Sequence, residues 1–180
     1  MMSQRYPGFI AIALLFGLLD SDLSKADELT QQTSPLPVEW HGYWTGKMTI
    51  TKANGERENV LITLKIEPIE NTKKATWALT YNNNGIKSVR DYTIIPIANK
   101  PGHYVIDEGN GIHLNVRLVG GVLYSQFVVG KSFLTARYEL RERKLQLEII
   151  AATRSPKQKR NQMVQTYQVD VLQTATLNKA

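Results

Sequence analysis

The sequence predicts an all-β protein, an antiparallel up-and-down barrel of about ten strands, from three observations. Apolar residues recur with a period of two through most of the chain after residue 38, as in strands with one buried face. Turn-forming residues separate these segments at short intervals, so neighbouring strands are joined by hairpins. No segment in this part carries a helical stripe of apolar residues. A meander of hairpins favours a barrel, because closure removes exposed edge strands.

The turns fix the expected strands in order along the chain. Asn54-Gly55 tolerates the positive φ of a tight hairpin, and so does the run Asn82-Asn83-Asn84-Gly85. Pro96 ends or bulges a strand, because proline offers no N–H to the sheet. In the second half, Gly109-Asn110-Gly111 and Gly120-Gly121 repeat the pattern. The expected strands are residues 44–52, 60–67, 77–81, 86–97, 103–106, 112–118, 122–129, 132–140, 144–153 and 163–173.

Two segments precede the predicted barrel domain, which we place at residues 38–175. Residues 9–19 are apolar, yet fewer than the roughly 20 residues that span a bilayer. They fit the apolar region of a secretory signal, and Ser24 and Ala26 are small residues where a signal peptidase cleaves. We therefore expect a signal peptide at 1–26 and a flexible, proline-containing linker at 27–37. An amphipathic or buried N-terminal helix is the alternative for the first segment.

Composition narrows the class of protein further. The chain contains no cysteine, which excludes disulfides, thiolate metal sites, thiol nucleophiles and lipid attachment through cysteine. With the predicted signal peptide, this favours a periplasmic or secreted protein. The net charge of +6 is concentrated in residues 141–144 and 154–160. Such clusters bind phosphate or anionic membrane surfaces, or are simply solvated hairpin loops.

The first predicted strand carries a recognisable motif, Gly42-Tyr43-Trp44-Thr45-Gly46. In this position the motif resembles the calycin group, which includes lipocalins and fatty-acid-binding proteins. The resemblance implies that Trp44 packs across the closed end of the barrel, beneath an arginine from a late strand. Arg137 and Arg154 are the candidates for that arginine.

The chain also departs from these families. A second lipocalin motif of Thr-Asp-Tyr type is only partly matched, by Arg90-Asp91-Tyr92, and the helical lid of fatty-acid-binding proteins is missing. A haem-binding branch of similar barrels uses a histidine near the C-terminus, whereas no histidine follows His113 here. We therefore predict no cofactor.

A barrel of this size either fills its interior with side chains or encloses a cavity. Aromatic residues supply much of the predicted inner surface, and a few polar groups offer contacts for a ligand head group. They either line a ligand site or only fill the core. The predicted ligand-binding residues are Trp77, Tyr81, Tyr104, Tyr124, Phe127 and Arg137.

No residue constellation indicates a reaction or a metal site. The three histidines are dispersed, whereas zinc needs three or four convergent ligands. Residues 107–111 are better explained as a tight turn than as a calcium loop. The serines lack a nucleophile elbow, and the carboxylates Asp91, Asp107, Glu108 and Glu139 are predicted at the rim or facing outward. An enzyme would instead require a buried, strongly perturbed carboxylate or histidine inside the barrel.

The sequence thus favours an exported, non-catalytic barrel that binds a small, largely apolar ligand in its interior. The alternative is a cell-envelope module that binds an anionic surface through basic loops, with Lys157, Lys159 and Arg160 as the contact residues. The expected partners are this ligand or this surface, with no nucleic acid and no second copy of the chain.

Overall fold

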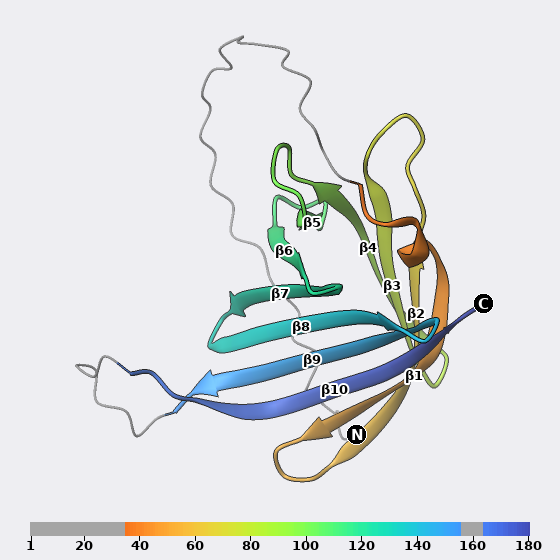
Figure 1. The fold of residues 1–180 in the computed structure, drawn as a ribbon. Coiled ribbons are helices and arrows are strands. Elements are labelled where there is room, and N and C mark those ends of the chain that lie inside the picture. Colours follow the sequence, from red (N-terminus) through yellow and green to blue (C-terminus); the bar gives the residue numbers. More distant parts are fainter. Residues whose placement is uncertain (1–34, 156–163) are drawn as a thin grey trace.

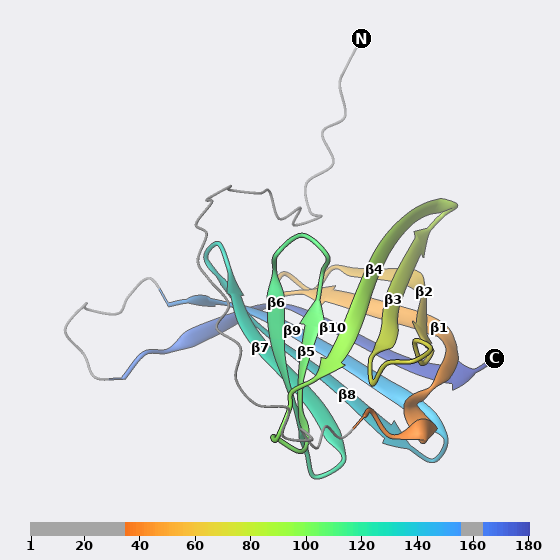
Figure 2. The ribbon, with the colours of Figure 1, turned by 90° about the horizontal axis from the view of Figure 1, so that it is seen from above.

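The computed structural model describes residues 35–155 and 164–180 and confirms the predicted fold class. Ten antiparallel strands form a closed barrel, in which each strand pairs with its neighbours in the chain and the last pairs with the first (Figures 1 and 2). A short 3-10 helix, η1 (Val38–Trp40), precedes the first strand. The strands are β1 (Gly42–Lys52), β2 (Arg57–Ile66), β3 (Ala75–Asn83), β4 (Ile86–Pro96), β5 (His103–Asp107), β6 (His113–Val119), β7 (Val122–Val129), β8 (Ser132–Arg141), β9 (Lys144–Arg154) and β10 (Tyr167–Lys179).

The barrel closes between β1 and β10, from Trp44 opposite Lys179 to Lys52 opposite Val171. The predicted last strand, residues 163–173, is therefore too short at its end, and β10 continues beyond the predicted domain boundary at 175. Ala175 and Leu177 are buried, so the alternation persists through a run that is rich in small and polar residues. Without this extension, the backbone groups at the start of β1 that point toward β10 would lack partners.

The connections gather at two ends of the barrel. The closed end carries η1 and the connections β2–β3, β4–β5, β6–β7 and β8–β9. The open end carries the connections β1–β2, β3–β4, β5–β6, β7–β8 and β9–β10. Because every strand runs between the two ends, each contributes inward-facing residues to both halves of the interior.

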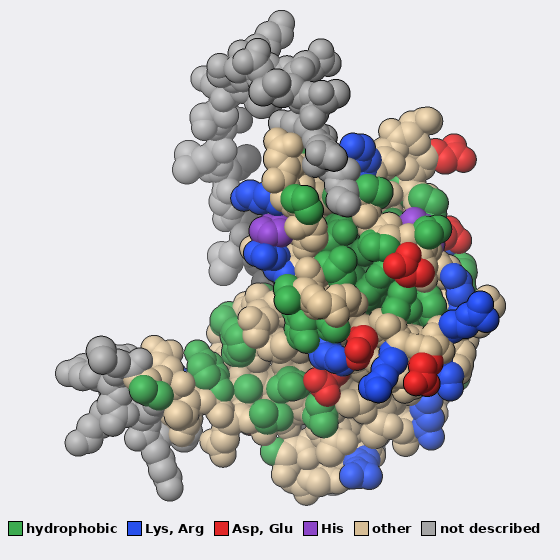
Figure 3. Space-filling view, in the orientation of Figure 1, with side chains coloured by type: hydrophobic (Ala, Val, Ile, Leu, Met, Phe, Trp, Pro, Cys, Tyr) green, Lys and Arg blue, Asp and Glu red, His purple; other side chains and the backbone are tan. Residues whose placement is uncertain are grey.

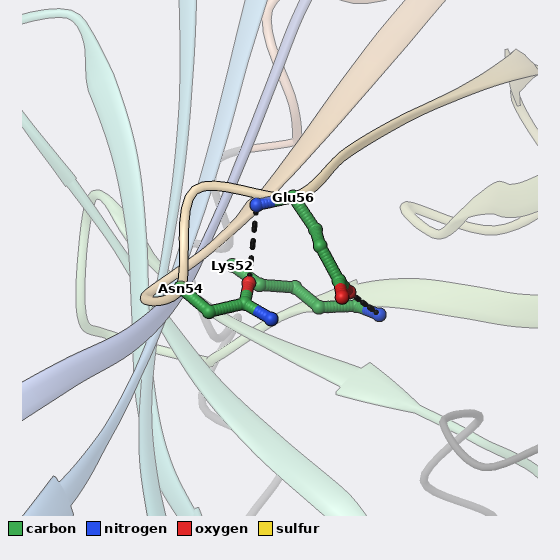
Figure 4. Close-up of polar contacts among 3 residues, drawn as sticks. All are labelled: Lys52, Asn54 and Glu56. Carbon is green, nitrogen blue, oxygen red and sulfur yellow. Dashed lines mark hydrogen bonds and ion pairs between the residues drawn. The ribbon is translucent and has the colours of Figure 1, made fainter.

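The β1–β2 hairpin confirms the turn predicted at Asn54-Gly55. The Lys52 ammonium lies 2.8 Å from a Glu56 carboxylate oxygen, and the Glu56 N–H donates to the Asn54 side-chain oxygen at 3.1 Å (Figure 4). The Gly55 N–H donates to the Lys52 carbonyl at 2.9 Å, and Gly55 adopts a φ of +86°. The turn is thus fixed by local contacts that the sequence itself specifies.

The packed chain begins before the predicted boundary at residue 38. Leu36 was expected in the flexible linker, yet it is buried in the core beside the closed end. The remainder of the predicted linker and the predicted signal peptide at 1–26 lie outside the described residues. Within residues 35–155 and 164–180, no helix has the length and apolar character needed to cross a membrane.

Candidate binding site inside the barrel

The closed half of the interior is filled by large apolar side chains. Alternation in the strands turns one face of each toward the axis, and in this half those residues are buried. Trp44 and Met48 come from β1, Leu64 from β2, and Leu145 and Leu147 from β9. This half is a packed apolar core.

The segment around η1 covers the closed end. The Trp44 indole N–H donates to the Trp40 carbonyl at 2.8 Å, and Trp40 is itself buried. The Tyr104 hydroxyl donates to the Pro35 carbonyl at 3.4 Å, which ties β5 to the incoming chain. Trp44 thus packs across the closed end, as the resemblance implied.

The cation over Trp44 differs from the prediction. Lys179 Nζ lies 5.2 Å from the centroid of the Trp44 ring, and neither Arg137 nor Arg154 occupies this place. Arg137 faces outward, and Arg154 lies at the far end of β9. The lysine is there because β10 extends to Lys179, which pairs with Trp44.

The open half is lined by inward-facing apolar side chains that are only half-buried. They keep contact with solvent although they point toward the axis, so they must border open space at the mouth. The inner surface of the open half is therefore partly exposed to solvent. These residues are Ile50, Tyr81, Tyr92, Leu114, Phe127 and Ile149.

A cluster of polar side chains, made up of Tyr81, Arg90 and Tyr92, lies on the β3–β4 side of this half. The register sets Leu79 opposite Arg90 and Trp77 opposite Tyr92, so Arg90 and Tyr92 face inward with the buried residues of β3. Arg90 has no carboxylate within 4.0 Å among the described residues, and it is half-buried. It is an inward-facing cation without a counter-ion there.

Burial raises the pKa of both Tyr81 and Tyr92, and the positive charge of Arg90 opposes the rise in each case. The Glu108 carboxylate, from the β5–β6 loop, adds to the rise at Tyr92 by its negative charge. Both phenols therefore stay neutral at ordinary pH. The Tyr92 side chain already hydrogen-bonds Glu108 and Arg90, so Tyr81 is the phenol that can donate to an acceptor in the open half.

Trp77 and Tyr138 lie deeper in the barrel than this cluster of polar side chains and form the floor of the candidate site. Their rings meet edge to face with centroids 5.0 Å apart. Burial raises the pKa of Tyr138, and the nearby Trp77 N–H only partly offsets this. The Trp77 N–H points toward Tyr138 but has no acceptor at hydrogen-bond geometry in the described structure. A buried donor without a partner costs stability, about 1–3 kcal/mol.

The structure brings three of the six predicted ligand-binding residues together. Trp77, Tyr81 and Phe127 all face inward, in or beside the open half. Tyr104 also faces inward, but it lies at the closed end, where it holds Pro35.

The prediction was wrong about the direction of Tyr124 and Arg137. These two residues pair across β7 and β8 on the outer face, because Leu123 and Ala136 beside them are the buried ones. Arg137 binds Glu139, and hydrogen bonds to Glu139 and Tyr124 raise its pKa. It therefore offers no contact to a ligand in the interior.

Arg90, Tyr92 and Tyr138 were not among the predicted site residues. A signal for the first two was present, because the Asn84-Gly85 turn sets the β3–β4 register. Counting back from that turn places Arg90 and Tyr92 opposite inward residues of β3. Tyr138 is adjacent to Arg137 in β8, so the two side chains face opposite sides of the sheet, and the tyrosine is the one that faces inward.

A hollow of about 800 Å³ lies on the outer surface and not in the interior. It runs over β1, β10, β9 and β8, and its charged side chains carry both signs, among them Lys47, Arg137, Glu139 and Glu148. Figure 3 shows blue and red side chains intermingled over β8–β10. Mixed charge on an open surface is typical of a solvated face, so we place no site there.

The described residues of the two basic clusters lie at opposite ends of the barrel. Residues 141–144 form the tight β8–β9 turn at the closed end, whereas Arg154 ends β9 at the open end. Strand geometry separates them by roughly 30 Å. Lys157, Lys159 and Arg160, the predicted contacts for an anionic surface, lie outside the described residues.

The histidines do not converge. His113 lies 3.5 Å from Asp107, His41 follows η1, and His103 begins β5. Burial lowers the pKa of His41. Among the described residues, no three histidine or carboxylate side chains gather as a metal site would require.

No protein-family model matches the chain, and no curated protein matches its sequence. The fold is similar to that of a DUF3598-family protein of unknown function from Nostoc punctiforme, with a TM-score of 0.56 and 13% identity. That match covers 82% of this chain and 51% of the other, so the chain spans about half the length of that protein.

The fold is also similar to that of the S-type phycobiliprotein lyase from Guillardia theta, with a TM-score of 0.55 and 7% identity. The match covers 79% of this chain and 89% of the lyase. At such identities the likeness concerns the fold alone. Both structures and the ten-strand meander fit a barrel of the lipocalin-like type.

Proposed function

We propose that the protein binds a small, largely apolar molecule in the open half of the barrel, with an anionic group at Arg90. The observation that carries the proposal is the combination of half-exposed apolar residues and a cation that forms no ion pair with the described residues, on the same inner surface. Apolar walls with a few converging polar groups are typical of ligand sites. Arg90 replaces Arg137 as the predicted partner of the anionic group.

The interior favours binding over acid–base catalysis. Apart from Glu58 at the rim and Glu108, which reaches Tyr92 from the β5–β6 loop, no carboxylate or histidine lies at the inner surface in the described part of the chain. One solved structure of similar fold is named a lyase, so the fold alone gives no support to a non-catalytic role. That role stays a prediction, and it rests on the residues of the inner surface.

The proposal is tested with 1-anilinonaphthalene-8-sulfonate, an apolar aromatic anion whose fluorescence rises in apolar surroundings. We expect saturable binding to the folded protein and about tenfold weaker binding to Arg90→Gln, since a charge-assisted hydrogen bond is lost. Arg137→Gln is the matched control, because it removes an arginine from the outer face of β8, which is separated from β4 by three strands. It should leave the affinity unchanged.

Two results would overturn the proposal. One is equal affinity of wild type and Arg90→Gln for the probe, with both variants showing the same unfolding transition. The other is a crystal structure in which the open half is filled by side chains, together with a native mass spectrum that shows no bound molecule.

The second part of the proposal is that the protein is exported from the cytoplasm. It rests on the sequence of residues 1–26, which lie outside the described structure. N-terminal sequencing of the protein from the periplasm or culture medium should begin near Asp27. Recovery of the full-length chain only from the cytoplasm would contradict export without affecting the binding proposal.

A further inference from the structure

The outer surface carries a row of apolar side chains where a solvated barrel wall would carry polar ones. Val128 of β7 pairs with Phe133 of β8, Phe133 with Ala152 of β9, and Ala152 with Val169 of β10. All four face outward, because the residues that alternate with them point to the axis. The row crosses four neighbouring strands near the open end.

The row belongs to a larger apolar surface, which we call the β7–β10 patch. Val128 is 66% exposed, Val169 56% and Tyr167 47%. The centroids of the Tyr167 and Phe133 rings lie 5.5 Å apart. In the next outward register position, Ile150 pairs with Leu172 and continues the patch along the wall. Figure 3 shows hydrophobic side chains over the ends of β8–β10 that lie away from the mixed-charge region.

Two cations flank the β7–β10 patch. Lys131 lies in the β7–β8 turn and Arg154 at the end of β9, and both are exposed. Neither forms an ion pair within the described part of the molecule. Asp170 is the acidic residue on these strand ends, and it is half-buried. The charge around the patch is therefore positive on balance.

We propose that the β7–β10 patch docks the barrel on a lipid surface that contains anionic headgroups. Exposed valine and tyrosine side chains can enter the interfacial region, while the flanking cations meet the headgroups. A second copy of the chain would bring the same cations into one interface, whereas anionic lipid offers the opposite charge. This inference is independent of a ligand in the interior, although it would set the open end beside the lipid.

The test is flotation of the full chain with vesicles of phosphatidylcholine alone and of phosphatidylcholine mixed with phosphatidylglycerol. Wild type should float with the anionic vesicles and be released by salt. Val128→Gln combined with Val169→Gln should weaken binding by at least about tenfold. Lys131→Gln and Arg154→Gln should each weaken it roughly fivefold on anionic vesicles only.

The matched control is Leu61→Gln combined with Val89→Gln. These residues are 60% and 61% exposed, face outward from β2 and β4, and lie outside the patch. All variants keep residues 9–19, so any contribution of that apolar segment is common to them. The control should bind as wild type does.

Equal flotation of the patch variant and its control would overturn the proposal. So would a dimer, seen by light scattering, that the Val128 and Val169 substitutions convert to monomer, because the patch would then bind a second copy. Binding of the anilinonaphthalene probe is measured on the same variants. It should depend on Arg90 and not on the patch, so that the two proposals fail separately.

Discussion

The closed and open halves of this barrel are built by the same strands with the same alternation, yet they are filled differently. At the closed end, Trp44, Trp40 and Leu36 pack together and the incoming chain covers the opening. At the open end, the inward positions hold a cation and tyrosines among half-exposed apolar residues. The difference teaches that alternation decides which face is inward, whereas side-chain volume and an added segment decide whether the interior is filled.

The largest contrast between the halves should appear when an aromatic side chain is removed from each. Trp44→Ala should lower the free energy of unfolding by about 3–5 kcal/mol, because it leaves a cavity and breaks the bond to Trp40. Phe127→Ala, in the half-exposed wall, should cost only about 1–2 kcal/mol. Urea denaturation of both variants measures the difference. Equal losses would mean that the open half is packed as tightly as the closed half.

Two glycines give a second contrast between the parts of the barrel: Gly46 is required by close packing, whereas Gly85 is required by the geometry of a turn. A Cβ at Gly46 would lie 2.5 Å from the Thr176 carbonyl oxygen and 2.9 Å from a Leu177 methyl. Gly46→Ala should therefore destabilise the barrel by about 3 kcal/mol through overpacking between β1 and β10.

Gly85, in the β3–β4 turn at the open end, is the matched control. A Cβ there would meet nothing within 4 Å, but its φ is +89°. Gly85→Ala should cost about 1 kcal/mol from backbone strain alone. Thermal unfolding of both proteins compares the two costs, and a smaller loss at Gly46 than at Gly85 would contradict the close β1–β10 contact.

Alkaline pH should lower the stability of the fold through Tyr138, which is buried at the floor of the site. Because burial raises the pKa of Tyr138, the folded state keeps this phenol neutral while the unfolded chain ionises it near pH 10. The stability it confers is complete below about pH 10 and falls above it, by up to about 1.4 kcal/mol per pH unit.

Tyr138→Phe should therefore flatten the loss of stability above pH 10, as measured by denaturant unfolding at several pH values. Tyr124→Phe, on the outer face, is the control. An alkaline slope that is the same in wild type and Tyr138→Phe would show that this phenol ionises as readily in the folded state as in the unfolded one.

The smallest effect is expected for the cation at the closed end. Lys179→Gln removes the ammonium 5.2 Å from the Trp44 ring and should cost about 0.5–1 kcal/mol. Lys144→Gln, an exposed lysine in the β8–β9 turn at the same end, should cost less. The melting temperatures of the two variants test whether Lys179 stabilises the fold through its contact with Trp44. Equal decreases in melting temperature would contradict this contact.

Local signals accounted for most of the fold and part of the site. The turn at Asn54-Gly55 carries its own hydrogen bonds, so it was predictable without knowing the rest of the chain. Trp77, Tyr81 and Phe127 were correctly assigned to the interior because each belongs to a clear alternation. The assignment of Tyr124 and Arg137 to the interior was wrong, because it followed the chemical character of the side chains and not the pairing of β7 with β8.

The sequence by itself determined the all-β class, the meander order and the place of Trp44, since these depend on periodicity, turns and a short motif. Only the tertiary structure decided that β10 runs on to Lys179, that this lysine lies over Trp44, and that no carboxylate of the described residues pairs with Arg90. Those facts depend on strand register and barrel closure, which join residues far apart in the chain. Strand register also set apolar residues of four strands in one outward row, although each of them alone looks like an ordinary strand residue.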